Sequence, residues 1–513
     1  MIKSNGGIIG PDNVTTGGAF GTASGVFKLG EVTDLIKDSK WPTAGPGGHQ
    51  VANSCRFNDG SSDNLSKTPS GDGSRVKWTW SGWVKRCSLG HQPIFSTPGN
   101  SSNIYDEFYF NSTDKIQFSA VVSGTQYALR TKRQFRDFSA WYSIVLIFDS
   151  NNSTASDRMQ LWINGVRTAE ADLEDITFKD AQNYNSATNK SGYVTYIGRV
   201  TTNSAAYYDG YMSEVAFQND SATTPVDKFG EFNSVTNIWV PKDISGLTFG
   251  TNGSYLDFKD SSALGNDAAG SNNFTANNLT SIDQSIDTCT NNFATLNPLA
   301  SLPNTGVSTF SEGNLVSQGV NGSYVNGGST FQMTTGKWYA EVKYLATSGD
   351  VGRIIIGITQ DVSEISRLNQ DNGSLNTTYN NYDGAGGKNV QGTGSTYGSD
   401  FGLNDIIGIA LDLDNEKLYF SVNGTWQNSG VPTSGSTGTG AITGFSSPSS
   451  SISGGYFFFS GSNTNAQNNT VSWNFGSPSF AISSGNADGN GFGNFEYAVP
   501  SGYLALCTNN LNV

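Results

Sequence analysis

The sequence predicts an all-β protein in which two β-sandwiches follow an extended N-terminal arm. Gly is abundant (62 residues against 14 Pro), while aromatic residues make up 12% of the chain and charged residues only 14%. Turn formers and strand formers therefore outweigh helix formers. Short stretches of alternating apolar and polar residues also recur along the chain, with turn signals between them. Finally, 513 residues exceed what one hydrophobic core usually organises, which favours two or three domains.

The charge balance excludes several kinds of partner. The formal net charge is −14, with 29 Lys and Arg residues and no basic run, whereas a protein that grips phosphates needs the opposite balance. We therefore expect no nucleic-acid partner. No apolar stretch reaches the ~18 residues of a membrane span, so we expect no membrane insertion. The first residues, MIKSNGGIIGPDN, lack the apolar core of a secretory signal, which predicts synthesis in a cytoplasm without signal-directed export.

Cysteine and histidine are scarce, and their spacing argues against zinc or nucleophilic chemistry. The four cysteines are scattered without a CxxC spacing, and only two histidines are present, too few for a zinc site. The sequence has no GxSxG elbow for a serine nucleophile. We expect buried free thiols at four positions: Cys55, Cys87, Cys289 and Cys507.

Residues 1–50 are predicted to form the N-terminal arm. The stretch GGIIGPDNVTTGGAFGTASG is rich in Gly and has no hydrophobic periodicity. Apolar residues then recur at helical spacing between Ser24, a candidate N-cap, and Trp41-Pro42, a stop signal. Such a short amphipathic helix is unstable alone, so we expect its apolar face to dock either on a partner or back on its own domain. That face consists of Val26, Phe27, Leu29, Val32 and Ile36.

Residues 51–240 are predicted to form the first sandwich. The stretches 75–86 and 106–122 alternate apolar and polar residues, and 140–150 is a mostly apolar strand. Residues 159–169 read MQLWINGVRTA. This pattern predicts a hairpin, because its Asn-Gly pair favours the positive φ angles of a type I′ turn.

Residues 241–300 are polar and rich in Asn, which predicts a loop-like connector, and residues 301–513 are predicted to form the second sandwich. Strands of the second region include GKWYAEVKYLA, VGRIIIGITQ and NDIIGIALDLDNEKLYFSVNGTWQ. The polar stretches 361–400 and 428–452 are predicted loops.

The two regions share one pattern, in which an apolar strand that ends in Asp precedes an alternating strand and an Asn-Gly turn. Asp149 precedes Asn164-Gly165 in the first region, and Asp412 precedes Asn423-Gly424 in the second. Two related sandwiches in tandem explain this repeat better than one large barrel. The second copy, DLDNEKLYFSVNGTW, is acidic, and we expect its acidity to be solvated surface at a turn too short to wrap a metal.

The ordered strands carry a resemblance to known folds. SCRFNDGSSDNLSKTPSGDGSRVKWTWSGWVKR, AWYSIVLIFD, MQLWINGV, YIGR and DGYMSEVAF resemble successive strands of a concanavalin A-like, laminin-G-type jelly roll over residues 52–220. GKWYAEV, DIIGIALDLD and LYFSVNG resemble the SPRY domain, another concanavalin-like sandwich. The resemblance implies two tandem concanavalin A-like jelly rolls.

Two further segments resemble virion proteins of marine and cyanobacterial phages: the leader TASGVFKLGEVTDLIKDSKWP and the polar connector. The resemblance implies a non-enzymatic structural protein on the virion surface, made in the cytoplasm of a bacterial host. Our first expectation is a tail fibre or receptor-binding adhesin whose sandwiches recognise host-surface glycans. The arm would bind other virion proteins, and a homotrimer is implied because fibres are commonly trimers. A capsid decoration or head-fibre protein is the alternative.

One motif has the pattern of a catalytic site. Residues 170–174 read EADLE, which resembles the E-x-D-x-E motif of laminarinase- and agarase-type glycoside hydrolases. On a strand, Glu170, Asp172 and Glu174 would share one face as nucleophile, assisting carboxylate and general acid. The surroundings RTAEADLEDITFKDAQN are polar, however, and a general acid needs an apolar enclosure that raises its pKa. We therefore expect a solvated acidic edge and no enzyme, and a polysaccharide-degrading hydrolase is the alternative from a different class.

Calcium is the one cofactor that the sequence suggests. Many laminin-G and lectin jelly rolls bind calcium through loop oxygens, and residues 148–157 offer such hard ligands. Asp and Asn are also the commonest turn residues, so ordinary loop chemistry is the alternative. The candidate ligands are Asp149, Asn151, Asn152 and Asp157.

Glycan recognition needs exposed aromatic rings among amide and carboxylate groups. Tyr379 and Tyr382 lie among Asn and Gly in a predicted loop, and Trp426 follows a hairpin turn. These rings either stack on a sugar or cover the edge of the sandwich.

Overall fold

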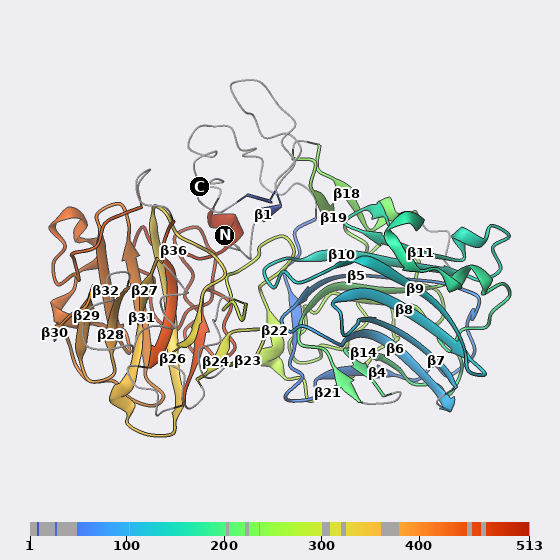
Figure 1. Ribbon diagram of the computed structural model, residues 1–513, viewed down its shortest axis with the longest axis horizontal. Helices are drawn as coiled ribbons and strands as arrows, with labels where there is room; N and C mark the ends of the chain where they lie inside the picture. Colours follow the sequence, from blue (N-terminus) through green and yellow to red (C-terminus); the bar gives the residue numbers. More distant parts are fainter. Residues whose placement is uncertain are drawn as a thin grey trace. The chain divides into compact units, whose positions relative to one another are not determined.

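The computed structural model describes residues 8–9, 26–27, 49–101, 103–201, 205–220, 225–234, 236–299, 308–319, 325–360, 379–448, 454–462 and 468–511. The chain divides into two units. The first unit contains residues 46–291, and the second contains residues 292–513 together with 1–45. Both are built from antiparallel β-sheets around a hydrophobic core (Figure 1), which confirms the predicted all-β class.

One layer of the first unit is sheet I. Its strands run in the order β12-β11-β10-β5-β17-β3-β22, and β20 also pairs with β17. The strands are β3 (Ser54–Phe57), β5 (Lys77–Arg86), β10 (Tyr142–Asp149), β11 (Met159–Ile163), β12 (Val166–Arg167), β17 (Gly210–Asn219), β20 (Ser254–Leu256) and β22 (Gln284–Ser285).

The other layer of the first unit is sheet II. Its strands run in the order β13-β9-β8-β7-β6-β14-β4-β21, and β6 to β9 form a continuous meander (Figure 1). The strands are β4 (Asn64–Lys67), β6 (Gln92–Ser101), β7 (Ile104–Phe110), β8 (Lys115–Val122), β9 (Thr125–Gln134), β13 (Leu173–Asp175), β14 (Thr195–Ile197) and β21 (Thr275–Asn277).

Aromatic rings fill the space between the two layers. Trp78 on β5 stacks on Phe148 of β10 with a centroid distance of 5.0 Å. It also meets Phe118 of sheet II edge to face at 5.5 Å. Because side chains alternate along a strand, Leu146 and Phe148 of β10 face this core, while Val145 faces the opposite side of sheet I.

An outer layer covers part of the other face of sheet I. It consists of residues 225–249, including the hairpin of β18 (Gly230–Phe232) and β19 (Trp239–Pro241). Val226, Phe229 and Trp239 from this layer pack against Val145 and Ile147 of β10 in a second apolar cluster. The first unit therefore has a third layer beyond its two sheets.

The predicted connector, residues 241–300, does not stand apart from the sandwich. Within it, β20 pairs with β17, β21 pairs with β4 and β22 pairs with β3. Several of its apolar residues are buried, among them Leu256 and Phe274. The Asn-rich composition concealed these anchors, and the division between the units falls at residues 291 and 292.

One layer of the second unit is sheet III. Its strands run in the order β23-β24-β35-β26-β31-β32-β33, and β36 pairs with β26 in parallel. The strands are β23 (Thr309–Ser311), β24 (Val316–Gln318), β26 (Lys337–Thr347), β31 (Ile406–Asp412), β32 (Lys417–Val422), β33 (Thr425–Trp426), β35 (Asn469–Asn474) and β36 (Leu504–Ala505).

The opposing layer is sheet IV, with the order β25-β34-β27-β28-β29-β30. Three of these strands lie within the stretch 361–400, which was predicted to be a loop. The stretch is mostly polar, but its Tyr382 occupies a buried position in the core of the second unit. The strands are β25 (Val325–Gly328), β27 (Ile354–Thr359), β28 (Tyr379–Asp383), β29 (Gly387–Val390), β30 (Thr393–Thr396) and β34 (Phe457–Ser462).

The remaining elements are short. Among the described residues, no helix is long and apolar enough to cross a membrane. The short strands are β1 (Ile8–Ile9), β2 (Val26–Phe27), β15 (Arg199–Val200) and β16 (Ala206–Tyr207). The 3₁₀ turns are η1 (Ala155–Asp157), η2 (Glu170–Asp172), η3 (Thr177–Asp180), η4 (Val226–Lys228), η5 (Ser281–Asp283), η6 (Val351–Arg353), η7 (Gln427–Ser429), η8 (Pro432–Thr437) and η9 (Thr508–Asn510).

The predicted N-terminal helix is wrong where it can be compared with the structure. Val26 and Phe27 form β2, which pairs antiparallel with β1. Pairing with Ile8 and Ile9 satisfies backbone groups that the expected helix would have satisfied internally. The other residues of the predicted apolar face, Leu29, Val32 and Ile36, lie outside the described residues.

The repeated pattern of the two regions is confirmed as a repeated structure. Each Asn-Gly pair forms a two-residue turn with positive φ angles at both positions, which are 48° and 76° at Asn164-Gly165 and 47° and 78° at Asn423-Gly424. These angles fit a type I′ turn. In both turns the Asn side chain accepts the N–H of the first strand of the pattern, from Ser143 at 2.9 Å and from Ile406 at 3.0 Å.

The repeat extends to a Lys-Trp pair at the start of the neighbouring strand, which is Lys77-Trp78 in the first unit and Lys337-Trp338 in the second. Lys77 on β5 lies opposite Asp149, and Lys337 on β26 lies opposite Asp412. Each lysine makes an ion pair with its aspartate. Asp412 is 0% exposed, so the expectation that the acidity at this hairpin is wholly solvated is wrong for its first residue.

Candidate functional site

A groove of about 730 Å³ lies on the outer side of sheet I in the first unit. One side is formed by β10 and β11 with the loop between them, and the other by the outer layer. We call it the outer groove. Aromatic rings line one part of it, and carboxylate and amide groups line the rest.

The aromatic part of the outer groove follows from strand alternation. Met159 and Leu161 of β11 face the sandwich core, so Gln160 and Trp162 between them face outward and line the groove. The Trp162 indole N–H donates to the Gln160 side chain at 3.3 Å. A half-buried indole is thereby presented to the groove.

The outer layer supplies two more rings. Trp239 on β19 and Phe232 on β18 meet edge to face with a centroid distance of 5.0 Å. The Trp239 ring is fixed because its indole N–H donates to the Ser143 hydroxyl at 3.1 Å. Phe232 is 45% exposed, so its ring is accessible from the groove.

The Asn-Gly turn makes room for Trp239. A side chain at Gly165 would place its Cβ 2.1 Å from the Trp239 ring, well inside contact distance. Gly165 also has a φ of 76°, a conformation that glycine adopts at little cost. The same turn that defines the repeat therefore positions one wall of the outer groove.

Asp149, Asn152 and Asp157 line the polar part of the outer groove. Lys77 Nζ lies 3.6 Å from Asp149 Oδ2. The other oxygen, Asp149 Oδ1, is buried and has no hydrogen-bond partner among the described residues. Arg167 makes an ion pair of 2.6 Å with Asp157.

The rim of the outer groove is also acidic. Asp227 and Glu231 lie on the outer layer and are exposed. Lys242 makes an ion pair of 3.1 Å with Glu231, and it donates to the backbone oxygen of Asp227 at 3.0 Å. Among the described residues that line the groove there are four carboxylates and no Lys, Arg or His side chain.

The predicted calcium ligands are brought together only in part, and their contacts do not fit a calcium site. Asp149, Asn152 and Asp157 share the outer groove, whereas Asn151 is exposed outside its lining. Lysine and arginine already supply positive charge to the two aspartates. The Asn152 side-chain oxygen accepts the Thr154 amide at 2.9 Å. Within the described part of the chain, no group of three or more His, Cys, Asp and Glu residues is placed to hold a metal.

The EADLE motif does not form the predicted strand. Glu170 and Asp172 lie in the 3₁₀ turn η2, and only Glu174 lies on a strand, β13. Glu170 makes an ion pair with Lys179 at 2.9 Å. The three carboxylates therefore do not share one strand face, as a nucleophile and general acid in that motif would.

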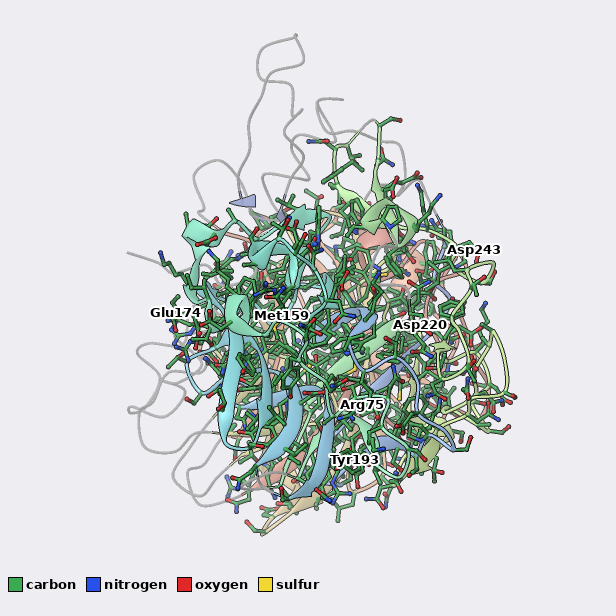
Figure 2. All side chains as sticks on the ribbon, turned by 90° about the vertical axis from the view of Figure 1, so that its right-hand side faces the viewer. Arg75, Met159, Glu174, Tyr193, Asp220 and Asp243 are labelled. Atoms are coloured by element: carbon green, nitrogen blue, oxygen red, sulfur yellow. The ribbon has the colours of Figure 1, made fainter. Side chains whose placement is uncertain are left out.

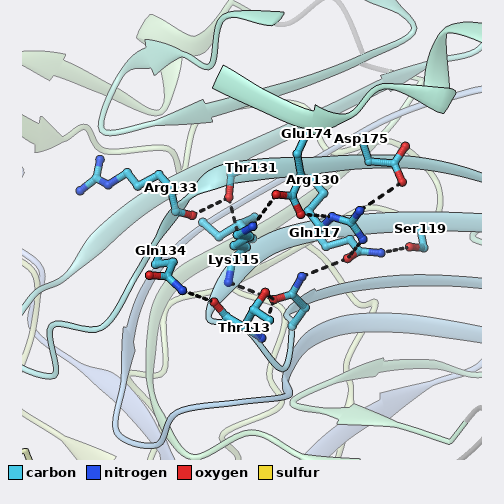
Figure 3. Close-up of polar contacts among 12 residues, drawn as sticks. Thr113, Lys115, Gln117, Ser119, Arg130, Thr131, Arg133, Gln134, Glu174 and Asp175 are labelled. Carbon is cyan, nitrogen blue, oxygen red and sulfur yellow. Dashed lines mark hydrogen bonds and ion pairs between the residues drawn. The ribbon is translucent and has the colours of Figure 1, made fainter. Parts of the chain in front are cut away.

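Glu174 is held by cations instead of an apolar enclosure. It makes ion pairs with Lys115 and, at 2.6 Å, with Arg130 (Figure 3). Figure 2 shows it at the outside of the molecule. The hydrogen bond from Lys115 is the largest cause of a lowered pKa for this carboxyl, whereas a general acid needs a raised one. The motif is an acidic edge paired with basic side chains.

The predicted sugar-stacking residues have different fates. Tyr382 is 0% exposed and packs against Tyr397 and Phe420 in the core of the second unit, so it cannot stack on a ligand. Tyr379 lies at the start of β28, and its side chain is outside the described atoms. Trp426 is half-buried on β33 and meets Tyr419 edge to face at 6.5 Å.

A buried carboxyl lies under the outer layer, away from the groove lining. Glu214 sits in a β-bulge of β17 with a φ of 51° and is 5% exposed. The Tyr255 hydroxyl donates to it at 2.7 Å. Burial raises the pKa of Glu214 to about 7, although the bond from Tyr255 opposes the rise.

Sequence reasoning missed the aromatic half of the outer groove. The signal for Trp162 was present, because alternation in MQLWING places it on the face opposite Met159 and Leu161. No comparable signal marked Phe232 and Trp239. They belong to the outer layer, whose docking on sheet I is a long-range contact.

Comparisons with known proteins agree with the two folds. Residues 59–225 match the family described as the concanavalin A-like lectin/glucanases superfamily, and residues 337–454 match the SPRY domain. No curated protein matches the chain. The chain therefore has one region similar to the concanavalin A-like superfamily and a second region similar to the SPRY domain.

Solved structures similar to the chain include three with sequence identities of 12% to 16%. A heptameric SAP-like pentraxin from Limulus polyphemus is 12% identical with a TM-score of 0.27, covering 39% of this chain and 100% of that one. The SPRY domain of human HERC1 is 12% identical with a TM-score of 0.26, covering 35% of this chain and 96% of that one.

The third is a candidate carbohydrate-binding protein from Bacteroides ovatus, 16% identical with a TM-score of 0.26. The match covers 45% of this chain and 59% of that one. At these identities and TM-scores, none of the three likenesses says anything about ligand or assembly.

Proposed function

We propose that this protein is a non-enzymatic glycan-binding protein of a virion surface, in which the outer groove holds a sugar. The groove supports the proposal because it combines what sugar recognition requires. Trp162 and Phe232 offer ring surfaces for a pyranose, and Asp149 and Gln160 offer acceptors for its hydroxyl groups.

The combination of ring and carboxylate in one open groove is the observation that carries the proposal. Exposed rings alone also occur at protein interfaces. Carboxylates alone are common on any acidic surface, and this chain has a net charge of −14. Together, on a sandwich that matches a lectin-type superfamily over residues 59–225, they favour a carbohydrate ligand.

An oligosaccharide array tests the proposal directly. The full chain is applied to neutral, amine-bearing and acidic oligosaccharides, and Trp162→Ala is compared with the unaltered protein. Loss of a stacking indole at the centre of a site typically costs about 2 kcal/mol or more. We therefore expect at least a tenfold weaker signal for the glycans that bind.

Trp426→Ala is the matched control, because Trp426 is also a half-buried tryptophan but lies in the second unit. Its signals should equal those of the unaltered protein. Loss with Trp426→Ala and not with Trp162→Ala would move the glycan site to the SPRY domain, as the sequence suggested. No binding to any glycan class would overturn the proposal.

The virion part of the proposal comes from the leader and the polar segment that resemble phage proteins. We propose a tail fibre or adhesin, attached to other virion proteins through residues 1–50 and assembled as a trimer. A capsid decoration or head-fibre protein is the second candidate. Electron cryo-microscopy of a particle carrying the tagged protein discriminates the two candidates. Density on the shell instead of the tail would select the capsid decoration or head-fibre protein. Sedimentation of the purified full chain gives the subunit count, and a monomer would contradict the trimer.

A further inference from the structure

The repeat within the chain provides an internal reference for the outer groove. Asp149 and Asp412 occupy equivalent positions, each at the end of an apolar strand and opposite a lysine. Their surroundings differ in one respect, the loop that follows. Residues 150–158 follow Asp149, whereas only residues 413–416 follow Asp412 before the next strand begins.

The short loop saturates the carboxylate of Asp412. The backbone amide of Asn415 donates to Oδ1 at 2.9 Å, and its side-chain amide donates to Oδ2 at 2.8 Å. Lys337 Nζ adds an ion pair at 3.0 Å. Both oxygens of Asp412 are therefore occupied by the chain itself.

The longer loop leaves Asp149 unsaturated. Asn152 turns its amide N–H to the backbone oxygen of Asp149 at 3.1 Å, and no donor reaches Oδ1 among the described residues. Lys77 Nζ stands 3.6 Å from Oδ2, farther than its counterpart. Asp149 is only 8% exposed, and a buried acceptor without a donor is costly.

We propose that the outer groove binds an amine-bearing sugar, a hexosamine whose free ammonium group pairs with the carboxylate of Asp149. This inference rests on the proposed glycan-binding function and names the class of glycan. An ammonium group supplies a further donor to this incompletely paired carboxylate, and charge-assisted bonds are stronger than neutral ones. The half-buried ring of Trp162 also favours a cation near its face.

The charges around the groove argue for the same class and against acidic sugars. Lys77, Arg167 and Lys242 are each engaged with one of the four lining carboxylates. Asp227, exposed at the rim, has no ion-pair partner in the described part of the chain. A uronic or sialic acid would bring a further negative charge to a groove whose lining has no cationic side chain to receive it.

The test compares four hexasaccharides built from pyranose rings, of which one is cationic, two are neutral and one is anionic. Affinities of the full chain are measured by calorimetry, in buffer with EDTA, for hexaglucosamine, hexa-N-acetylglucosamine, cellohexaose and hexagalacturonate. A charge-assisted bond is worth about 10- to 100-fold in affinity. Hexaglucosamine should therefore bind at least tenfold more tightly than cellohexaose, and hexagalacturonate should bind most weakly.

The variant Asp149→Asn separates the groove from the general acidity of the chain, because a net charge of −14 attracts any polyamine. It should reduce the preference for hexaglucosamine over cellohexaose, taken as the ratio of the two affinities of the same variant, to less than about threefold. Asp412→Asn, the same change at the equivalent position, should leave the preference unchanged. Circular dichroism verifies that both variants fold. The comparison of the four ligands with the unaltered protein tests the inference even if a variant does not fold.

Several outcomes would overturn the inference, and each is distinct from failure of the proposed function. Equal binding of hexaglucosamine and cellohexaose, both lost in Trp162→Ala, leaves a glycan site without an amine requirement. If the preference for hexaglucosamine persists in Asp149→Asn, the overall charge of the chain causes that preference. Binding that appears only when calcium replaces EDTA assigns Asp149 to a metal. If none of the four binds and the array is also blank, the proposed function fails as well.

Discussion

Replacing Glu341 by Gln should loosen the C-terminal part of the second unit. Glu341 lies on β26 and is 0% exposed. Its Oε1 accepts the Tyr497 amide at 2.8 Å and the Tyr339 hydroxyl at 3.1 Å. Its Oε2 accepts the Glu496 amide at 2.9 Å and the Asn474 side-chain amide at 3.2 Å. One carboxylate thus fastens residues far apart in the sequence.

The magnitude follows from the number of acceptors lost. Glutamine keeps one oxygen, but its NH₂ group faces the two donors that the other oxygen accepted. Each buried donor left without a partner costs about 1–3 kcal/mol. Glu341→Gln should therefore lower the free energy of unfolding of the second unit by about 2–6 kcal/mol.

Hydrogen–deuterium exchange of the full chain in urea measures this change separately in each unit. Peptides from β26 report the second unit, and peptides from β5 report the first, which should be unaffected. Glu416→Gln is the matched control, because Glu416 is exposed and accepts one bond, from the Ser447 amide at 2.9 Å. It should change stability by no more than about 0.5 kcal/mol. A loss below about 1 kcal/mol for Glu341→Gln would refute the reasoning.

Three other predictions concern the first unit. Since burial raises the pKa of Glu214 from 4.5 to about 7, the folded chain holds this proton more tightly than the unfolded chain does. The resulting stabilisation, about 3 kcal/mol, is complete below pH 4.5 and is lost as the pH rises through 7. Thermal unfolding measured across this pH range should show the loss, and Glu214→Gln should flatten the dependence of stability on pH. Gly165→Ala, which forces a Cβ against Trp239, should cost about 1–3 kcal/mol in urea unfolding, whereas Gly246→Ala, with open space around its Cβ, should cost little. Glu174→Gln should change stability by no more than about 1 kcal/mol, because its ion pairs are exposed. If the unaltered chain released sugar from a polysaccharide and Glu170→Gln abolished that release, the proposal of a non-enzymatic protein would be contradicted.

Local patterns in the sequence were sufficient to predict the central strands of both cores, although not β28, β29 and β30. Apolar runs such as the one ending in Asp149 became central strands, and both Asn-Gly pairs became the predicted turns. Alternation and turn chemistry are properties of neighbouring residues, so a single sequence displays them. The prediction of two tandem sandwiches rested on these signals.

Long-range contacts could not be predicted in the same way. The segment 241–291 looked like a linker because its anchors are isolated, yet residues such as Leu256 are buried in the sandwich. Tyr382 looked exposed among Asn and Gly, yet it lies in a core. The outer groove depends on the docking of Trp239 and Phe232 on a face of sheet I that no local pattern identifies.

The structure places several of the predicted site residues differently from the expectation, for a related reason. The EADLE motif was read on a strand, but η2 interrupts it before β13 begins. The candidate calcium ligands were chosen by residue type, and the cations that pair with Asp149 and Asp157 come from Lys77 and Arg167 elsewhere in the sheet. Which charges meet is a property of the fold.

The two aspartates of the repeat show how this scaffold can acquire a new site by insertion. The core positions, the opposing lysine and the Asn-Gly turn are the same in both units. The length of one surface loop decides whether the carboxylate is sealed by its own chain or faces a groove. Lengthening such a loop costs little stability, so a sandwich of this kind can present a different surface at this position while its core packing is retained.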